Sequence, residues 1–582
     1  MCGIAGILSF NSQPVSIAAL KKMTDAIAHR GPDGEGQWQN SRGQVALGHR
    51  RLSIIDLSEH GKQPMHYLNT RYTITFNGEI YNYVELKNDL VQQGYSFQSG
   101  SDTEVLLALY DLKKEKCLQD LDGMFAFAIW DEQEQSLFCA RDRFGEKPFY
   151  YYHEEEKEFS FASEMKALWA AGKPRNIDLE MLSAFFKNSV VMDASDLGRT
   201  FYTNIRQLKA SHFLKIDRKN KITIEPYYSL ENISQNKSIT EKEAAQQFLQ
   251  LLTDSVRLRL RSDVPVGSSL SGGLDSSSIV MLMDKLKGDT TNQNTFSARF
   301  KGFKKDEGNY IHKVVDACKN VTCHEVWPDD EQLVHELDKV FFHQEEPFGS
   351  GSIFAQWKVM ELAKQKGVTV LLDGQGADEQ LAGYIPHYSG YLNQLFYHQK
   401  SNYKNEWEKY NFYHGANYPQ KNLIDEETFP MTIGRWKRKI TGAEMPYKAN
   451  QLQQNLLADT TGFGLKTLLR YADRNAMAHS REVRLPFLSH HLVEFVFSLP
   501  DNYKLQNGWT KYVLRKAMEN ILPQEITWRV DKIGYVSPQD KWLENAQLQS
   551  RIKLARGKSN DLFNDKIDTS ISEWKLLMLS FL

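Results

Sequence analysis

The sequence predicts two domains of different class, an α+β domain followed by an α/β domain with a parallel sheet. The chain has 582 residues, which is more than one hydrophobic core usually holds. Up to about residue 210, short apolar strands come in runs with few helices between them, which is typical of an α+β domain. From about residue 240 onward, strands and helices alternate, which favours a parallel sheet.

The composition excludes several classes of function. A formal net charge of -2 provides no basic field for nucleic acid. No apolar run approaches the ~18 residues of a transmembrane helix, and the N-terminus lacks the basic and apolar regions of a signal peptide. We therefore expect a cytoplasmic protein without nucleic-acid or membrane partners.

The cysteines predict neither disulfides nor a zinc site. Their number, 5, is odd and their spacing is irregular. Cys318 and Cys323 lie close together with His324 beside them, but no second ligand pair follows at zinc spacing. We expect buried structural thiols at these two positions.

The first domain is placed at residues 2–218. Its apolar, aromatic segments predict strands at residues 71–76, 124–130, 136–140 and 148–152, and a helix at residues 83–93. Glycine-rich loops are expected between these elements, at residues 29–34, 77–79 and 100–104.

Cys2 is the candidate nucleophile of this domain. A small residue after Met1 favours removal of the methionine, which would leave a thiol and a free α-amine on one residue. The amine titrates near about pH 8 and the thiol near about 8.5. The amine can therefore serve, directly or through a water, as the base for its own nucleophile. The alternative is an inert cysteine that happens to stand second.

The second domain is placed at residues 239–582, after a polar stretch at 219–238 with one short strand at 222–228. A long helix is expected at 241–261. A strand at 264–270 then runs into Ser271-Gly272-Gly273-Leu274-Asp275-Ser276-Ser277, and a helix follows from about residue 278. A strand, a Gly/Ser turn and a helix N-terminus form an anion site, in which backbone and hydroxyl donors converge. The Gly-Lys-Ser/Thr of a P-loop is absent from this segment.

The alternation continues with a strand at 295–300, a helix at 308–318 and a strand at 368–372. The last strand runs into residues 373–379, where a second loop could close on the same ligand. Asp275 and Asp378 are the candidate Mg²⁺ ligands, because this hard cation prefers carboxylate and phosphate oxygens. Aspartates that form a turn or cap a helix are the alternative.

A set of motifs runs through the first half: Cys2-Gly3-Ile4, His29-Arg30-Gly31-Pro32-Asp33-Gly34, Arg51-Leu52-Ser53-Ile54, Asn77-Gly78-Glu79, Ser101-Asp102, Arg141-Asp142-Arg143-Phe144-Gly145-Glu146-Lys147-Pro148 and Phe161-Ala162-Ser163-Glu164. In this order they resemble the N-terminal-nucleophile glutamine amidotransferases. The resemblance implies an αββα fold and attack of Cys2 on glutamine.

The same resemblance implies roles for five further residues. The Asn77 side chain and the Gly78 N–H form the oxyanion hole that amide hydrolysis needs. Arg51 suits the α-carboxylate of glutamine as a bidentate fork, and Glu79 and Asp102 suit its α-ammonium. A structural ion pair for Arg51 and a helix N-cap for Asp102 are the alternatives.

The Ser-Gly-Gly-Leu-Asp-Ser-Ser segment resembles the pyrophosphate loop of enzymes that cut ATP to AMP and pyrophosphate. The resemblance implies that ATP is bound by Leu270, Ser271, Gly272, Gly273, Asp275, Ser276, Ala298 and Gly374. It also places Lys511 against the phosphates, where a solvated surface lysine is the alternative.

Both halves, in this order and over nearly the whole chain, resemble the glutamine-hydrolysing asparagine synthetase family. The resemblance implies that glutamine is hydrolysed in the first domain and that ammonia passes through a tunnel to the second. There a carboxylate, aspartate by default, is adenylated by ATP with Mg²⁺ and converted to an amide. The sequence does not determine the oligomeric state, and a homodimer is one assembly that we consider.

The chain departs from the family at the second site. The family loop reads Ser-Gly-Glu-Gly-(Ser/Ala)-Asp-Glu, whereas here Gln375 replaces the middle acid and an acid appears earlier as Asp373. Glutamine cannot take a proton from ammonia. Either Asp373 has taken over this role and is the base, or the chemistry tolerates the loss of the loop acid. Ser489 stands where the family has Asp, and residues 385–460 match no motif.

These departures leave the acceptor open. A paralogue that amidates another carboxylate, such as a sugar acid of a surface polysaccharide or a peptide side chain, is the close alternative. A sensor of glutamine or nucleotide is disfavoured, because it need not keep Cys2, Asn77, Asp275 and Lys511 together. A β-lactam-forming relative is disfavoured because it has no use for Cys2.

Overall fold

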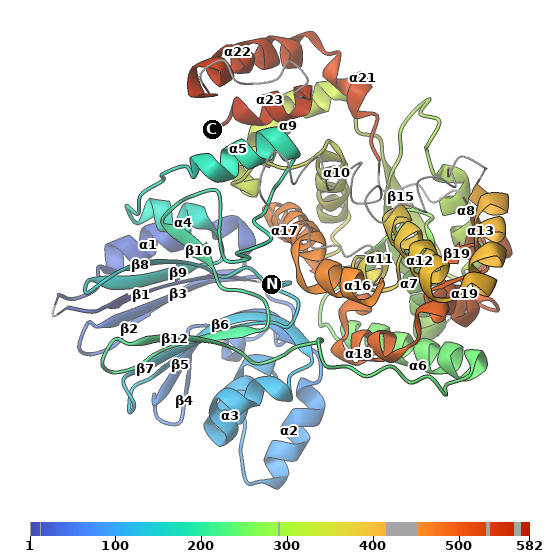
Figure 1. The fold of residues 1–582 in the computed structure, drawn as a ribbon. Coiled ribbons are helices and arrows are strands. Elements are labelled where there is room, and N and C mark those ends of the chain that lie inside the picture. Colours follow the sequence, from blue (N-terminus) through green and yellow to red (C-terminus); the bar gives the residue numbers. More distant parts are fainter. Residues whose placement is uncertain (1, 12, 289–291, 415–451, 531–535, 564–571) are drawn as a thin grey trace.

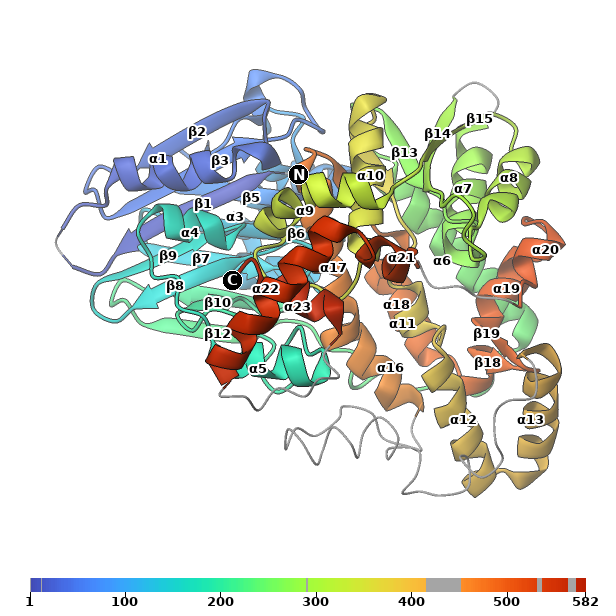
Figure 2. The same ribbon diagram turned by 90° about the horizontal axis from the view of Figure 1, so that it is seen from above.

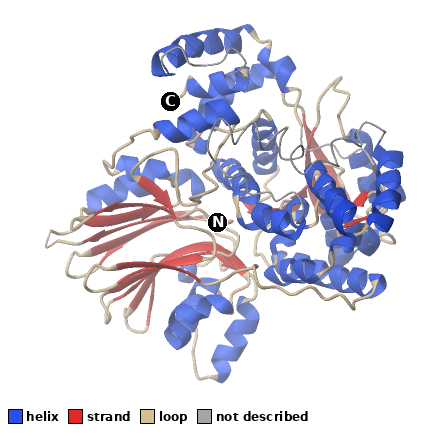
Figure 3. Cartoon of the chain, in the orientation of Figure 1, coloured by secondary structure: helices blue, strands red, loops and turns tan. Residues whose placement is uncertain are grey.

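A computed structural model describes residues 2–11, 13–288, 292–414, 452–530, 536–563 and 572–582. Two halves lie side by side, a β-sandwich flanked by helices and a domain built on a parallel sheet (Figures 1 and 3). Met1 and the middle of the unmatched 385–460 stretch, residues 415–451, lie outside the described residues.

The first half is an αββα sandwich, as the resemblance implied. Its strands are β1 (Gly3–Ser9), β2 (Gly34–Gln39), β3 (Val45–Arg51), β4 (Met65–Tyr67), β5 (Tyr72–Ile80), β6 (Gly123–Asp131), β7 (Ser136–Arg141), β8 (Tyr150–Glu154), β9 (Glu158–Ala162), β10 (Ile205–Gln207), β11 (His212–Ile216) and β12 (Ile222–Pro226). One antiparallel sheet has the order β10-β8-β9-β1-β3-β2 and the other β12-β11-β7-β6-β5-β4.

Helices cover the outer face of each sheet. Helices α1 (Ile17–Ala26) and α4 (Met165–Ala170) lie on the first sheet, and α2 (Tyr83–Gln92) and α3 (Asp102–Lys113) on the second (Figure 1). Every residue of β1 and of β5 is buried, because each strand is covered on both faces. This burial explains why β1 is a nearly continuous run of apolar and small residues. In β5, apolar residues alternate with buried polar ones such as Thr73 and Thr75.

The expectation of a loop at residues 77–79 is wrong. Asn77, Gly78 and Glu79 lie inside β5 and pair with Ala126, Phe125 and Met124 of β6. A Cβ on Gly78 would lie 2.2 Å from the Met124 carbonyl oxygen, so the neighbouring strand leaves room only for glycine. The glycine marks a close backbone approach and not a turn.

The strand expected at 222–228 is present as β12. It pairs with β11, so the second sheet continues past residue 218. Helix α6 (Glu241–Arg259) begins after Thr240, whose side chain forms a capping box with Glu243.

The second half contains a five-stranded parallel sheet in the order β15-β14-β13-β16-β17. Its strands are β13 (Val266–Ser269), β14 (Gln293–Ala298), β15 (Val321–Val326), β16 (Val370–Leu372) and β17 (Glu482–Arg484), and β18 (Leu505–Gln506) pairs separately with β19 (Trp509–Thr510). This confirms the predicted α/β class.

The helices of this half include α7 (Leu274–Lys287), α8 (Gly308–Ala317), α9 (Asp330–Gln344), α10 (Ser352–Gln365), α11 (Ala377–Gln380), α12 (Ile385–His398), α13 (Lys400–His414), α16 (Leu452–Thr461), α17 (Phe463–Ala478), α18 (His490–Ser498), α19 (Tyr512–Met518), α20 (Gln524–Thr527) and α21 (Gln539–Leu543). Helix α5 (Leu179–Asn188) of the first half lies near the C-terminal helices α22 (Ala546–Phe563) and α23 (Glu573–Leu579) (Figure 2). Helix α17 runs along the seam between the halves (Figures 1 and 2).

Helix α7 begins four residues earlier than expected. Gly273 is its N-cap and Asp275 stands in its first turn. An acidic residue in the first turn stabilises a helix through the helix dipole, which favours this earlier start. Among the described helices, none combines the length and apolar character needed to cross a membrane.

Candidate active sites

Cys2 lies buried directly before β1, at the end of the sandwich that faces the second half. Its side chain is 8% exposed and its Sγ lies 3.9 Å from the Leu52 carbonyl oxygen. Burial raises the pKa of the Cys2 thiol. Such a thiol is protonated near neutral pH, so it needs a base before it can act as a nucleophile. All five cysteines are free, and Cys318 and Cys323 are half-buried rather than fully buried as expected.

Asn77 lies against Cys2. The Cys2 backbone N–H donates to Asn77 Oδ1 at 2.9 Å. Asn77 Nδ2 is buried and has no hydrogen-bond partner. An unsatisfied buried donor is costly and indicates a missing acceptor. This geometry suits an amide donor for an oxyanion formed at Cys2.

Arg51 is buried at the end of β3, with its guanidinium turned to a neighbouring loop. It donates to the carbonyl oxygens of Ser58, at 2.9 Å, and of Asp56. Among the described residues it forms no ion pair with a carboxylate, which disfavours the structural ion pair as the reason for its position. The assignment of Arg51 to the glutamine carboxylate stays a prediction.

Glu79 and Asp102 form an acidic pocket beside Cys2. Burial raises the pKa of Asp102 to about 6, and burial together with Glu482 raises the pKa of Glu79 well above its usual range. Glu79 Oε2 has no hydrogen-bond partner. Asp102 accepts from the Ile80 N–H at 2.9 Å and does not cap α3, because Ser101 is the N-cap.

This pocket predicts a pH dependence of glutamine hydrolysis. A protonated carboxyl cannot hold an ammonium as an ion pair, so kcat/KM for glutamine should fall as pH falls through the Asp102 pKa of about 6. Glutamate release measured from pH 5 to 8 checks this. Asp102→Asn should lower kcat/KM at neutral pH and remove the inflection, whereas Asp89→Asn, exposed on α2, should keep it. A flat profile in the unaltered protein would contradict the assignment.

The Ser/Gly loop of the second half joins β13 to α7. Gly272 has a φ of +73°, and a Cβ there would lie 2.7 Å from the Tyr310 Cβ, so only glycine fits. The Ser271 and Ser276 hydroxyls lie 3.1 Å apart, and Gly273 caps α7 without a side-chain hydrogen bond. The first-turn N–H groups of α7 are thereby left for an anion.

Two more of the predicted nucleotide contacts lie beside this loop. The Leu270 N–H donates to the Phe296 carbonyl oxygen at 2.9 Å, and Ala298 ends the adjacent parallel strand β14. A Cβ on Gly374 would lie 3.0 Å from the Asp275 Cβ, so the loop after β16 touches the loop after β13. The structure therefore brings the predicted residues together at the carboxyl ends of neighbouring strands, where α/β sheets bind ligands.

Lys511 connects the two loops and is not a solvated surface lysine. It is 3% exposed, and its Nζ lies 2.5 Å from Asp275 Oδ2 and 2.8 Å from Asp378 Oδ1. Asp275 Oδ1 is buried and has no hydrogen-bond partner. Two converging carboxylates with one unsatisfied oxygen fit a hard cation shared with phosphate oxygens.

Both departures from the family lie on one pair of touching loops. Asp373 follows β16 and accepts from the Gly374 N–H at 2.7 Å, and burial raises its pKa. Gln375 Oε1 is buried without a partner. A Cβ on Gly376 would lie 2.5 Å from a Leu488 methyl carbon, and Ser489 is the next residue. Gln375 and Ser489, each of which stands where the family has an acid, thus lie beside the same part of the site.

A buried charge network joins the halves along α17. Arg30 donates from Nε to the Cys2 carbonyl oxygen at 3.0 Å and forms two hydrogen bonds with Asp473, at 2.8 and 2.9 Å. Arg474 pairs with Glu345 at 2.6 Å and with Glu164 at 3.1 Å. These charges fix the nucleophile's segment against the second half.

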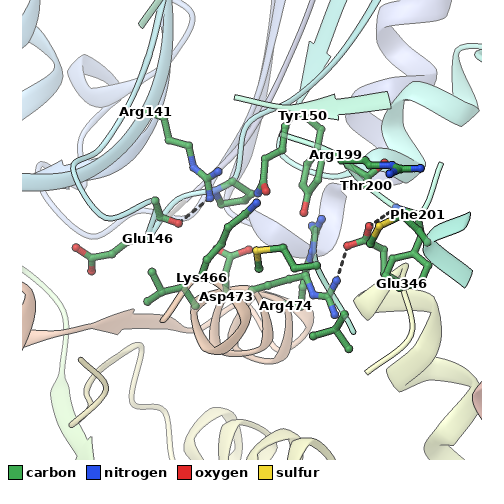
Figure 4. Close-up of a pocket in the computed structure, with 18 residues that line it drawn as sticks. Arg141, Glu146, Tyr150, Arg199, Thr200, Phe201, Glu346, Lys466, Asp473 and Arg474 are labelled. Carbon is green, nitrogen blue, oxygen red and sulfur yellow. Dashed lines mark hydrogen bonds and ion pairs between the residues drawn. The ribbon is translucent and has the colours of Figure 1, made fainter. Parts of the chain in front are cut away.

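A cavity lies in this seam. Arg141 and Tyr150 of the sandwich face Lys466, Asp473 and Arg474 of α17 across it (Figure 4). Burial lowers the pKa of Lys466 to about 7. The wall nearest to Cys2 contains Asp473, because this residue binds Arg30.

The seam residues were not predicted as functional. Arg30 and Glu164 stand inside the motifs that carried the resemblance, and Asp473 lies on α17, yet sequence reasoning gave none of the three a role. One sequence feature could have identified them: they are charged residues inside otherwise buried helix and strand segments. Such charges are almost always paired with a partner.

The fold and the two pockets define a class: an N-terminal-nucleophile amidotransferase domain joined to a parallel-sheet nucleotide-binding domain. The model of the glutamine amidotransferase domain matches residues 1–228, and that of asparagine synthase matches residues 247–568. The chain belongs to the glutamine-hydrolysing asparagine synthetase family.

Three curated proteins illustrate the range of relatives. Asparagine synthetase [glutamine-hydrolyzing] 1 of Bacillus subtilis is 33% identical over 94% of this chain and 88% of its own. Putative asparagine synthetase [glutamine-hydrolyzing] 2 of Methanocaldococcus jannaschii is 39% identical over 67% of this chain and 77% of its own. Amidase chry2 of Gibberella zeae is 28% identical over 93% of this chain and 90% of its own. The relatives therefore include both synthetases and a protein named as an amidase.

Proposed function

We propose that this protein transfers the amide nitrogen of glutamine to an adenylated carboxylate and so makes an amide, with release of AMP and pyrophosphate. Aspartate is the acceptor we expect, with asparagine as product. The supporting observation is the pairing of a buried Cys2–Asn77 pocket with a Ser271–Ser276 anion loop in one chain. We place the two activities in residues 2–218 and 239–582, with β12 forming the edge of the second sheet of the sandwich between them.

In the first pocket, the Cys2 α-amine takes the thiol proton, directly or through a water, once Met1 has been removed. The thiolate attacks the amide carbon of glutamine, and Asn77 Nδ2 and the Gly78 N–H stabilise the oxyanion. Ammonia leaves, and water releases glutamate from the thioester. A free thiol at Cys2 requires a reducing compartment, so we propose a cytoplasmic location.

In the second pocket, the α7 N-terminus and the serine hydroxyls hold the phosphates of ATP. Asp275 and Asp378 would hold Mg²⁺, which supplies charge neutralisation when bound. Lys511 stabilises the charge that develops on the phosphates while the acceptor carboxylate displaces pyrophosphate. Ammonia then attacks the acyl adenylate, and AMP leaves.

A second candidate is the same chemistry on a different carboxylate, such as a sugar acid or a peptide side chain. The observation that favours it is the position of Gln375 and Ser489 on adjoining loops beside the nucleotide site. With Gln375 and Ser489 in place of the family's two acids, the acceptor pocket offers different hydrogen-bond partners and less negative charge to the acceptor's polar groups.

Asp373 is the proposed base for ammonia in place of the family's loop glutamate. We expect Asp373→Asn to lower amide synthesis by about 10²-fold or more, the usual size of a general-base effect. Gln375→Asn, which also keeps an amide, should lower it far less. Initial rates with saturating ammonia as nitrogen source make the comparison independent of the first pocket. Equal small losses would remove Asp373 as the base.

The test of the function is pyrophosphate release by purified protein with ATP, Mg²⁺ and glutamine, with and without aspartate, beside glutamate release. Pyrophosphate that appears only with aspartate, together with asparagine, supports the first candidate. Glutamate release without aspartate-dependent pyrophosphate supports the second. Absence of both would refute the proposal.

A further inference from the structure

The second half contributes charged residues to the candidate glutamine pocket. Arg484 of β17 is fully buried, and its Nη2 lies 3.6 Å from Glu79 Oε2. Neither of these two atoms has a hydrogen-bond partner. The two groups therefore attract each other without the short contact that a bound pair would make.

Buried charges from both halves meet in this pocket. Glu79 and Asp102 of the first half face Glu482 and Arg484 of β17, and the buried Lys147 also lowers the pKa of Glu482. Glu482 raises the pKa of both Glu79 and Asp102, and Arg484 lowers it. A ligand ammonium bound at Glu79 would compete with Arg484 for this carboxylate.

Arg484 is also bonded to the second site through its backbone. Leu372, the last residue of β16, is paired with Arg484 in β17, and the Asp373 N–H donates to the Arg484 carbonyl oxygen at 3.0 Å. The next residue, Gly374, approaches Asp275. One residue thus touches the glutamine pocket with its side chain and the nucleotide loop with its backbone.

The rest of the Arg484 side chain is firmly held. Its Nε donates to Glu482 Oε1 at 2.6 Å, and its Nη1 donates to the Arg259 and Arg261 carbonyl oxygens at 2.7 and 2.6 Å. Only Nη2 is left to respond to Glu79. A change at Glu79 is therefore transmitted to the strand rather than absorbed by a rotation of the side chain.

We propose that Arg484 couples the two sites: glutamine binding takes Glu79 from Arg484, and the resulting shift of β17 alters the Asp373–Gly374 loop at the nucleotide site. The proposal rests on the proposed function, because it takes Glu79 as the ligand of the glutamine ammonium. Thermodynamic linkage then requires nucleotide binding to change glutamine affinity by the same factor.

The test uses full-length protein with Cys2→Ala, which binds glutamine without consuming it. Titration calorimetry measures the Kd of glutamine without and with a non-hydrolysable ATP analogue and Mg²⁺. We expect the nucleotide to tighten glutamine binding about fivefold or more, the lower end of measured allosteric couplings. Arg484→Lys, which is shorter and loses the forked contacts, should bring the ratio to about one.

Arg481→Lys is the matched control. Arg481 donates to the His479 and Val368 carbonyl oxygens near the same strands and not to Glu79, so its variant should keep the coupling ratio. An unchanged ratio in Arg484→Lys, or a ratio of one in the parent protein, overturns the proposal. Failure of the proposed function looks different, because glutamine or the nucleotide would then not bind at all.

Amide hydrogen exchange gives a second test that does not depend on the folding of an Arg484 variant. The Asp373 N–H is bonded to the Arg484 carbonyl oxygen, so glutamine binding to the Cys2→Ala protein should change its exchange rate. The exposed helix α2 supplies reference amides within the same sample. Unchanged exchange at residues 373–376 on saturation with glutamine overturns the proposal.

Discussion

Cys2→Ala should abolish amide synthesis from glutamine while sparing synthesis from free ammonia. Within the described part of the chain the thiol's one hydrogen-bond contact is weak, 3.9 Å from the Leu52 carbonyl oxygen, so its removal should leave the fold intact. Loss of a catalytic nucleophile typically costs about 10⁴-fold or more in rate. The second site lies in the other half and should accept ammonia from solution as before. Amide formation with glutamine and with ammonium chloride, each as sole nitrogen source, checks both parts.

Cys318→Ala is the control for that substitution. Cys318 is a half-buried thiol of the second half that lies beside Met281. Its loss should leave both nitrogen sources usable. Retained glutamine-dependent synthesis in Cys2→Ala would remove Cys2 as the nucleophile. Loss of both activities in a variant whose thermal unfolding matches that of the unaltered protein would contradict the assignment of the two reactions to separate sites.

Lys511→Met should produce the converse result. Pyrophosphate release should fall by at least about 10²-fold with either nitrogen source, because a preorganised charge at the phosphates is removed. Glutamate release should persist, since the glutamine pocket lies in the other half. Assays of pyrophosphate and of glutamate on the same sample separate the two effects.

Replacing Lys511 removes a buried positive charge and should lower the free energy of unfolding, so the experiment needs controls for stability. Asp275 and Asp378 would lose the ammonium that bridges them, and breaking a buried ion pair typically costs about 3–5 kcal/mol. Lys511→Arg keeps the charge and should fold better than Lys511→Met, yet its fork is longer and should still impair pyrophosphate release. Lys504→Met is the matched control, because this buried lysine donates to the Leu499 carbonyl oxygen and not to the aspartates. Normal pyrophosphate release in both Lys511 variants would refute its role.

Much of the fold followed from local pattern. Apolar runs at residues 124–130 and 136–140 became β6 and β7, and the Ser/Gly turn after residue 269 was correctly placed between a strand and a helix. These features depend on periodicity and turn chemistry, which a single sequence displays directly. The error at Asn77–Glu79 has the opposite origin, because only the packing of β6 reveals that Gly78 belongs inside a strand.

The contacts between the halves could not be predicted in this way. Arg30 and Asp473 are 443 residues apart, and Glu79 meets Arg484 across the seam. No local pattern encodes such partners, because each charge satisfies its neighbour only after the halves have docked. Motif reasoning found the residues proposed to touch ligands, whereas the residues that hold the two pockets together needed the structure.

The central claim is that nitrogen released at Cys2 reaches the acceptor within the protein. The most direct measurement supplies [amide-¹⁵N]glutamine together with an excess of unlabelled ammonium and determines the ¹⁵N content of the product amide. We expect a product enriched in ¹⁵N well beyond the bulk ratio of labelled to unlabelled ammonia. A product whose label equals the bulk ratio would mean that ammonia equilibrates with solvent between the sites, which contradicts the account.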